Sequence, residues 1–376
     1  MISILAILTL LFALLSLVAL MVIHEFGHFI IAKKFGVRVD EFGIGYPPRI
    51  FGKKIGETIY SINWISLGAF VRIYGEEGGV DDYRSFAGLE IWKRFLIIVG
   101  GVVAFWIASM IIFSVMFMIG TELPIGDEDV QGVKNARITI IEVMGNSAAE
   151  KAGLKMGDVV EAINVDGVEN QINKISEFKE ITSANKGKEI TLAVKRDGQD
   201  LNILLTPAEN SESPVGVGIQ RMATLIEKYP WYMAPVQGVI YTWQTTYGAL
   251  KGLYIMFAGL FSGTGMPQGA EFAGPLGITI FLANAASYGL GFFLYFVGSI
   301  SVFIAIFNLF PIPALDGGKL VFLIIEKIKG SPVSVKIEQN ITMVCFVALI
   351  LLSIFITVKF DFPRVGEYFT QAISRK

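Results

Sequence analysis

The sequence is poor in charge, in cysteine and in histidine. Only 17% of its 376 residues are charged and the formal net charge is -2, which gives no basis for nucleic-acid binding. The single cysteine, Cys345, excludes a fold held together by disulfides. With 53% hydrophobic residues and a mean hydropathy of +0.60, the composition is that of a membrane protein with room for one water-soluble domain.

Both histidines of the chain fall within one short motif, His24-Glu25-Phe26-Gly27-His28. On a helix, two histidines four residues apart lie on one face, one turn apart, and can supply two ligands to Zn²⁺. The preceding residues 1–23 carry no charge and are long enough to cross a lipid bilayer. Ionisable side chains at that depth are costly and indicate function. We therefore predict His24 and His28 as metal ligands and Glu25 as the catalytic base.

Uncharged segments predict four transmembrane helices in a multi-pass protein. They run from about Ile2 past His28, from Phe95 to Gly120, from roughly Gly289 to Phe310, and from Ile341 to Val358. The first lacks a basic leader and a cleavage site, so we interpret it as a retained span. Residues 229–265 are interrupted by polar side chains, and we expect a helix on the outer membrane surface there.

The loops between the spans differ in charge and in pattern. Residues 33–94 and 319–336 are rich in lysine and arginine, which predicts a cytoplasmic location. In the first loop, residues 58–65 and 69–74 are predicted strands flanking a turn at Gly68. Residues 127–207 contain strand patterns and Asp-Gly turns, and predict an inserted α+β domain on the outer side. The expected division is thus a membrane part at 1–126, this domain at 127–207, and a second membrane part at 208–376.

A zinc site needs a third protein ligand, and the chain has no third histidine. Cys345 lies deep in another predicted span, so a carboxylate must supply the ligand. In residues 308–318, Pro311 and Pro313 break a helix at membrane depth, which is tolerated where the freed backbone faces protein or a wet cavity. Asp316 follows this break and is the predicted third ligand. Asn308 either caps the broken helix or holds the backbone of a substrate.

These motifs together resemble the site-2 protease family of intramembrane zinc metalloproteases, in its bacterial branch of regulator of sigma-E proteases. Residues 24–28 match the first family motif, and residues 308–318 match the second, in which the aspartate is the third zinc ligand. Residues 41–48 and 66–71 resemble the membrane-associated β region that guides an unwound substrate. The resemblance implies one group of substrate-binding residues, namely Gly43, Gly45, Gly68, Asn308, Pro311 and Pro313.

The inserted domain resembles a PDZ domain of bacterial proteases through residues 149–160. Whether such a domain would bind peptide or only exclude bulky substrates stays open from the sequence. One departure from the family concerns the second span, where an asparagine often lies near the site. Phe105 occupies that position here.

The resemblance implies a metalloendopeptidase with one Zn²⁺ per chain, located in the bacterial inner membrane. Its active site would lie near the cytoplasmic side and its PDZ-like domain outside. Its substrate would be a single-pass membrane protein, such as an anti-sigma factor in stress signalling, after trimming by an upstream site-1 type protease. Two alternatives remain. One is a membrane zincin that cuts at the membrane surface and takes its third ligand from Glu326; the other is a non-catalytic, PDZ-bearing membrane adaptor.

Overall fold

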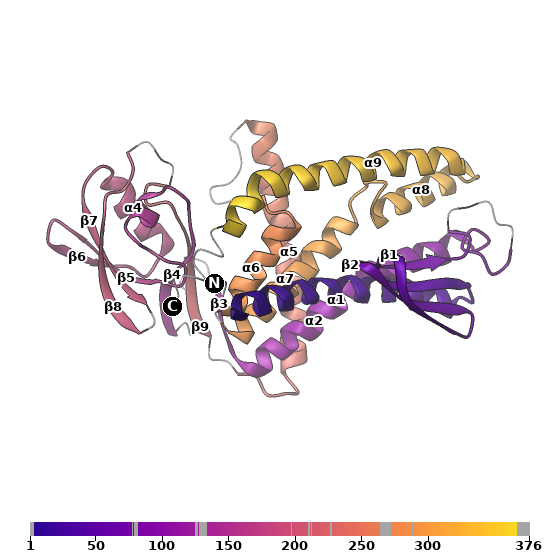
Figure 1. Ribbon diagram of the computed structural model, residues 1–376, viewed down its shortest axis with the longest axis horizontal. Coiled ribbons are helices and arrows are strands. Elements are labelled where there is room, and N and C mark those ends of the chain that lie inside the picture. Colours follow the sequence, from indigo (N-terminus) through magenta and orange to yellow (C-terminus); the bar gives the residue numbers. More distant parts are fainter. Residues whose placement is uncertain are drawn as a thin grey trace. The chain divides into compact units, whose positions relative to one another are not determined.

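A computed structural model describes most of the chain, as two compact units (Figure 1). The described residues are 4–76, 78, 82–124, 127, 134–196, 198–209, 211, 213–225, 228–263, 272–287 and 289–366. The membrane unit comprises residues 1–116 and 231–376, and the inserted unit comprises residues 117–230.

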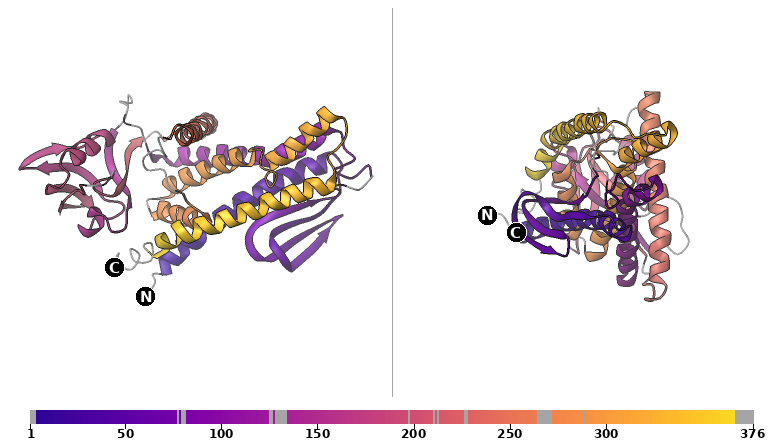
Figure 2. Two further views of the ribbon diagram at one scale, coloured as in Figure 1. Left: turned by 90° about the horizontal axis from the view of Figure 1, so that it is seen from above. Right: turned by 90° about the vertical axis from the view of Figure 1, so that its right-hand side faces the viewer.

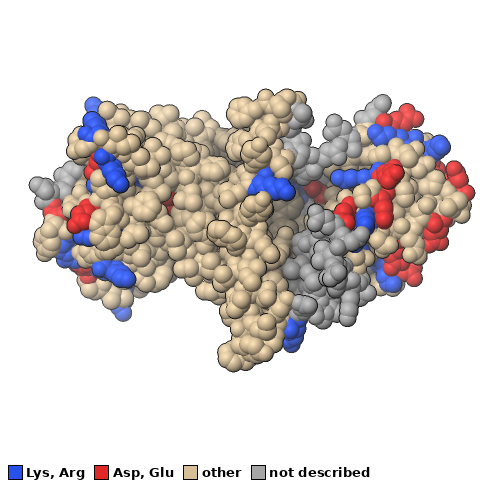
Figure 3. Space-filling view, turned by 180° about the vertical axis from the view of Figure 1, so that it is seen from behind, with Lys and Arg blue, Asp and Glu red and all other residues tan. Residues whose placement is uncertain are grey.

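Four helices of the described chain are long and apolar enough to cross a membrane. They contain α1 (Ile4–Lys34), α2 (Ile91–Ile119), α7 (Leu290–Asn308) and α9 (Val335–Ile356), which a π-helical turn at Thr357–Asp361 extends. All four coincide with predicted spans. Figure 3 shows a broad surface of the membrane unit without charged side chains, with charge gathered at the end that carries the β1–β2 hairpin. This surface suits contact with lipid.

Two further helices complete the bundle of the membrane unit. The helix predicted within 229–265 is α5 (Ala234–Ser262), and α6 (Pro275–Ser287) packs against α1 and α7. Figures 1 and 2 show α5 running crosswise to α1 and α2. The hydroxyls of Ser109 and Ser301 both donate to the backbone carbonyl of Phe105, at 3.0 and 2.8 Å. These bonds join α2 to α7, where small and polar residues hold membrane helices together.

The loop after α1 forms a hairpin of two long antiparallel strands, β1 (Val39–Ile55) and β2 (Thr58–Ile73). The prediction of two strands separated by a turn at Gly68 is wrong, because β2 is continuous. Gly68 has φ +105° and bends the strand, so both halves of β2 pair with β1. Gly43 lies opposite both Ser61 and Phe70. The last residues of β2, 69–73, therefore form an outer edge beside α1.

The inserted unit is one antiparallel sheet with short helices. Its strand order is β3-β9-β4-β5-β7-β8, with β6 paired to β5. The elements are β3 (Thr121–Pro124), β4 (Lys134–Val143), α3 (Ala148–Lys151), β5 (Val159–Val165), β6 (Val168–Gln171), α4 (Ile175–Ala184), β7 (Ile190–Arg196), β8 (Gln199–Leu205) and β9 (Val217–Leu225). Ile138, Ile163 and Leu192 lie fully buried in its core. The unit extends beyond the predicted 127–207, because β9 pairs with both β3 and β4.

Candidate active site

The two histidines lie where α1 and α2 approach most closely. A Cβ atom added to Gly27 would lie 2.3 Å from the carbonyl oxygen of Gly100, so the two helices meet backbone to backbone. One residue further, a Cβ on Gly101 would lie 2.3 Å from Nε2 of His28 and 2.7 Å from Cε1 of His24. Only glycine at position 101 leaves room for the two imidazoles.

The loop between α7 and α8 (Asp316–Lys329) positions the third predicted ligand. Helix α7 ends at Asn308, and Pro311 and Pro313 follow, neither of which can continue it. The loop then folds over the first turn of α8: a Cβ on Gly317 would lie 2.2 Å from the carbonyl oxygen of Phe310. This contact fixes Asp316 as the first residue of α8, where the helix dipole favours a carboxylate.

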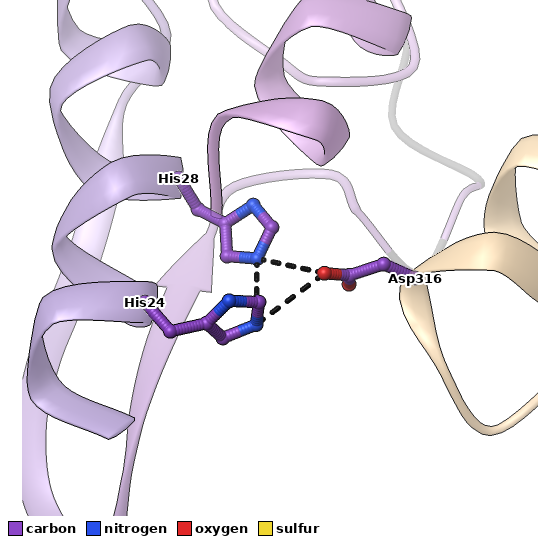
Figure 4. A group of neighbouring side chains, drawn as sticks. All are labelled: His24, His28 and Asp316. Atoms are coloured by element: carbon purple, nitrogen blue, oxygen red, sulfur yellow. Dashed lines mark hydrogen bonds and ion pairs between the residues drawn. The ribbon is translucent and has the colours of Figure 1, made fainter. Parts of the chain in front are cut away.

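The three predicted ligands converge (Figure 4). Oδ2 of Asp316 lies 3.3 Å from Nε2 of His24 and 3.3 Å from Nε2 of His28, and the two Nε2 atoms are 3.3 Å apart. Nδ1 of His28 lies 2.8 Å from the carbonyl oxygen of Ile97, which can accept its proton and leave Nε2 as a ligand. Two imidazoles and a carboxylate directed at one point fit a zinc ion.

Glu25 lies between the ligands and the hairpin. Its Oε2 accepts a hydrogen bond of 3.0 Å from the backbone N–H of Val71, on the outer edge of β2. Glu25, His28 and Asp316 line a cavity of about 180 Å³, together with residues of that same strand edge. The candidate base, two candidate ligands and an exposed strand edge thus share one space.

The predicted substrate-binding residues lie around this cavity, and none is among the described residues that line it. Asn308, Pro311 and Pro313 belong to the end of α7 and the following loop. The three glycines shape the hairpin: a Cβ on Gly43 would lie 2.4 Å from the ring of Phe70, and one on Gly68 2.9 Å from Tyr46. Gly45 adopts φ +77°. Both aromatic side chains do line the cavity, so the glycines act through them.

Several functional positions were not found from the sequence. Gly101 was not recognised, although paired glycines in an apolar helix indicate close helix packing. Lys319 also lines the cavity, one turn after Asp316 on α8. Phe105 stacks on His24 with ring centroids 4.6 Å apart, where the family often has a polar residue. The alternative ligand Glu326 instead pairs with Arg94, at 2.9 and 2.5 Å.

A buried cluster of two histidines and an aspartate, beside a glutamate and within apolar helices, defines a membrane-embedded zinc peptidase. Residues 12–352 match Peptidase family M50, and the chain belongs to this family, that of the site-2 proteases. The expected family is thereby confirmed. The chain is a zinc metalloprotease.

Relatives cover nearly the whole chain. A Clostridium perfringens protein named as a zinc metalloprotease is 32% identical over 93% of this chain and 97% of its own length. The regulator of sigma-W protease of Bacillus subtilis is 26% identical, covering 89% of this chain and 93% of its own. The regulator of sigma-E protease of Salmonella typhimurium is 27% identical, covering 90% and 94%.

One solved structure matches a smaller part. The PDZ domain of an SdrC-like protein from Listeria monocytogenes covers 23% of this chain and 90% of its own. At 18% identity and a TM-score of 0.20, this likeness is too distant to establish the fold of the inserted unit.

Proposed function

We propose that this chain is an intramembrane protease that hydrolyses peptide bonds in the transmembrane segments of single-pass membrane proteins. The observation that carries the proposal is the convergence of His24, His28 and Asp316 beside Glu25, on helices apolar enough to span a membrane. These three residues would hold Zn²⁺, with Glu25 as the base.

Each group has a defined part in the reaction. When bound, zinc supplies Lewis-acid chemistry that polarises the scissile carbonyl and acidifies water. Glu25 accepts the proton of the attacking water and returns it to the leaving amine. The carbonyl of Ile97 holds His28 in the orientation and tautomer needed for ligation. Because Val71 N–H holds Glu25, the base is oriented by the strand next to it.

The strand edge explains how a helical substrate reaches the site. A peptide bond inside a helix is shielded by its own backbone, so the substrate must unwind before hydrolysis. The edge at residues 69–73 is not covered by β1 and borders the cavity. An extended peptide can add to such an edge through main-chain hydrogen bonds. We propose that the unwound substrate lies along this edge, with the scissile bond beside Glu25.

Substrate class and location follow from the relatives. Two of them are named as regulators of sigma-W and sigma-E proteases. We infer that the substrate here is a membrane-bound regulator such as an anti-sigma factor, trimmed first by an upstream protease, in the bacterial inner membrane. The basic loops would be cytoplasmic and the inserted unit external. Cysteines at Ala87 and Glu169, both exposed, in a Cys345→Ala background should then label from opposite sides of sealed cells.

The central test separates ligands from base. Purified protein should carry about one zinc per chain. His28→Ala and Asp316→Ala should lose most of it, whereas Glu25→Gln should retain zinc and cleave a model transmembrane substrate about 10²- to 10⁴-fold more slowly. Glu326→Gln is the matched control and should keep its zinc. Zinc retained in Asp316→Ala but lost in Glu326→Gln would reverse the ligand assignment. A zinc-loaded wild type without cleavage would favour the adaptor alternative.

A further inference from the structure

The cavity beside Glu25 has few side chains that can donate a hydrogen bond to a substrate. Among the described residues that line it, Glu25, Glu76 and Asp316 are acceptors as carboxylates, and His28 is a proposed zinc ligand. Phe105 places an aromatic ring, not a donor, against His24. Two side-chain donors remain, the phenol of Tyr46 and the ammonium of Lys319.

Lys319 is held in the cavity from two directions. It lies three residues after Asp316 on α8, so the two side chains project from the same face of the helix. Its Nζ lies 2.6 Å from Oε1 of Glu76, which follows β2. The negative charge of Glu76 raises the pKa of Lys319 above its ordinary value, although burial opposes this, so the side chain is a cation at neutral pH.

Peptide hydrolysis creates negative charge where a cation is needed. Water adds its hydroxyl to the carbonyl carbon and its protons pass by way of Glu25, so the carbonyl oxygen becomes anionic before the C–N bond breaks. A positioned donor acts most strongly on this developing charge, and only weakly on the neutral carbonyl of the bound peptide. Neither an oxidant nor a further reactant takes part.

We propose that Lys319 is a catalytic residue that donates a hydrogen bond to the carbonyl oxygen of the scissile peptide as its negative charge develops. Glu76 is the positioning residue that holds Lys319 toward the cavity. This assignment rests on the proposed function, since it requires the scissile bond to lie beside Glu25. The bland alternative is that Lys319 and Glu76 form an ion pair that only joins α8 to the loop after β2.

Kinetics on the full-length protein distinguish these roles. Lys319→Met should lower kcat by about 10²- to 10³-fold with little change in KM and with normal zinc content. It should weaken inhibition by a phosphinic peptide, an anionic mimic of the tetrahedral state, by a similar factor. Lys319→Arg should restore a substantial part of both. Glu76→Gln, which keeps a hydrogen-bond acceptor for Lys319, should cost only a few-fold.

Controls make every outcome decisive. Tyr46→Phe removes the other donor and should leave kcat within a few-fold of wild type; a large loss there with Lys319→Met active would assign the role to Tyr46. Equal losses in Glu76→Gln and Lys319→Met, accompanied by lower zinc content or thermal stability, would establish the structural ion pair instead. A wild type that neither binds zinc nor cleaves would overturn the proposed function. Wild-type cleavage that survives in Lys319→Met would overturn only the role of Lys319.

Discussion

The membrane unit and the inserted unit are held together by different kinds of contact. In the inserted unit, apolar side chains from strands and helices fill one core, as in a water-soluble domain. In the membrane unit, large apolar residues such as Leu15 and Ile111 are more than half exposed, and no residue of α9 is buried. Lipid can cover such surfaces, so tight packing there is needed only where helices cross at glycine or where polar groups are enclosed. Precision in the membrane unit is concentrated at the catalytic site.

The largest effect that sharpens this contrast is predicted for Gly101→Ala. The added methyl group would overlap both imidazoles, and we expect zinc affinity to fall about 10- to 100-fold, with activity falling in parallel. Gly248→Ala in α5 is the matched control, because a Cβ at that position meets no atom within 4 Å. Zinc titration of the two variants is the measurement. Equal zinc affinity in both would mean that the histidines have space that the crossing geometry denies them.

Removing the inserted unit is the second way to sharpen the comparison. Because β3 and β9 belong to its sheet, the deletion should take residues 120–229 and replace them with a Gly/Ser linker of about ten residues. If the unit acts by excluding substrates that still carry a bulky external domain, zinc and catalysis should persist and untrimmed substrate should be cut. Cleavage rates of trimmed and full-length substrate give the answer.

The opposite result of the same deletion has its own meaning. If the inserted unit instead binds the substrate and adds affinity, the deletion would slow cleavage of the trimmed form and leave the full-length form uncut. That outcome would end the exclusion hypothesis and favour peptide capture, while leaving the assignment of the zinc ligands intact.

The smallest effect concerns Asp127, whose oxygens accept 2.7 Å hydrogen bonds from the backbone N–H groups of Ile175 and Ser176 at the start of α4. Partial burial opposes ionisation, but these bonds keep the pKa of Asp127 below its ordinary value. Asp127→Ala should destabilise the inserted unit by about 1 kcal/mol, seen as faster hydrogen exchange in α4. A depressed carboxyl pKa stabilises above the unfolded pKa, so the difference should vanish below about pH 4. A difference that persists at lower pH would exclude the charged cap as its cause.

The parts of the site that are local in sequence could be predicted, and those made by distant contacts could not. The spacing of His24 and His28 on a helix is a local pattern, and Asp316 followed from the need for a third ligand and from the two prolines before it. The Phe105 carbonyl, Gly101 and Lys319 gain their roles only when α2, α7 and α8 pack around α1, which no short motif records.

The same distinction explains the errors in the β regions. Gly68 has the local signature of a turn, yet pairing of both halves of β2 with β1 keeps the strand continuous. The boundaries of the inserted unit were too narrow because β3 and β9 pair across about a hundred residues of sequence, and strand pairing of that range leaves no local trace.

The backbone contact between Gly27 and Gly100 also bears on how the protein can live in bilayers of different thickness. Transmembrane helices adjust to such differences by tilting. A tilt of α1 or α2 about their crossing point displaces the helix ends most and the crossing point least, as with the two blades of a pair of scissors. His24 and His28 lie within one turn of that point. The ligands therefore sit at the pivot, where a change of lipid moves them least.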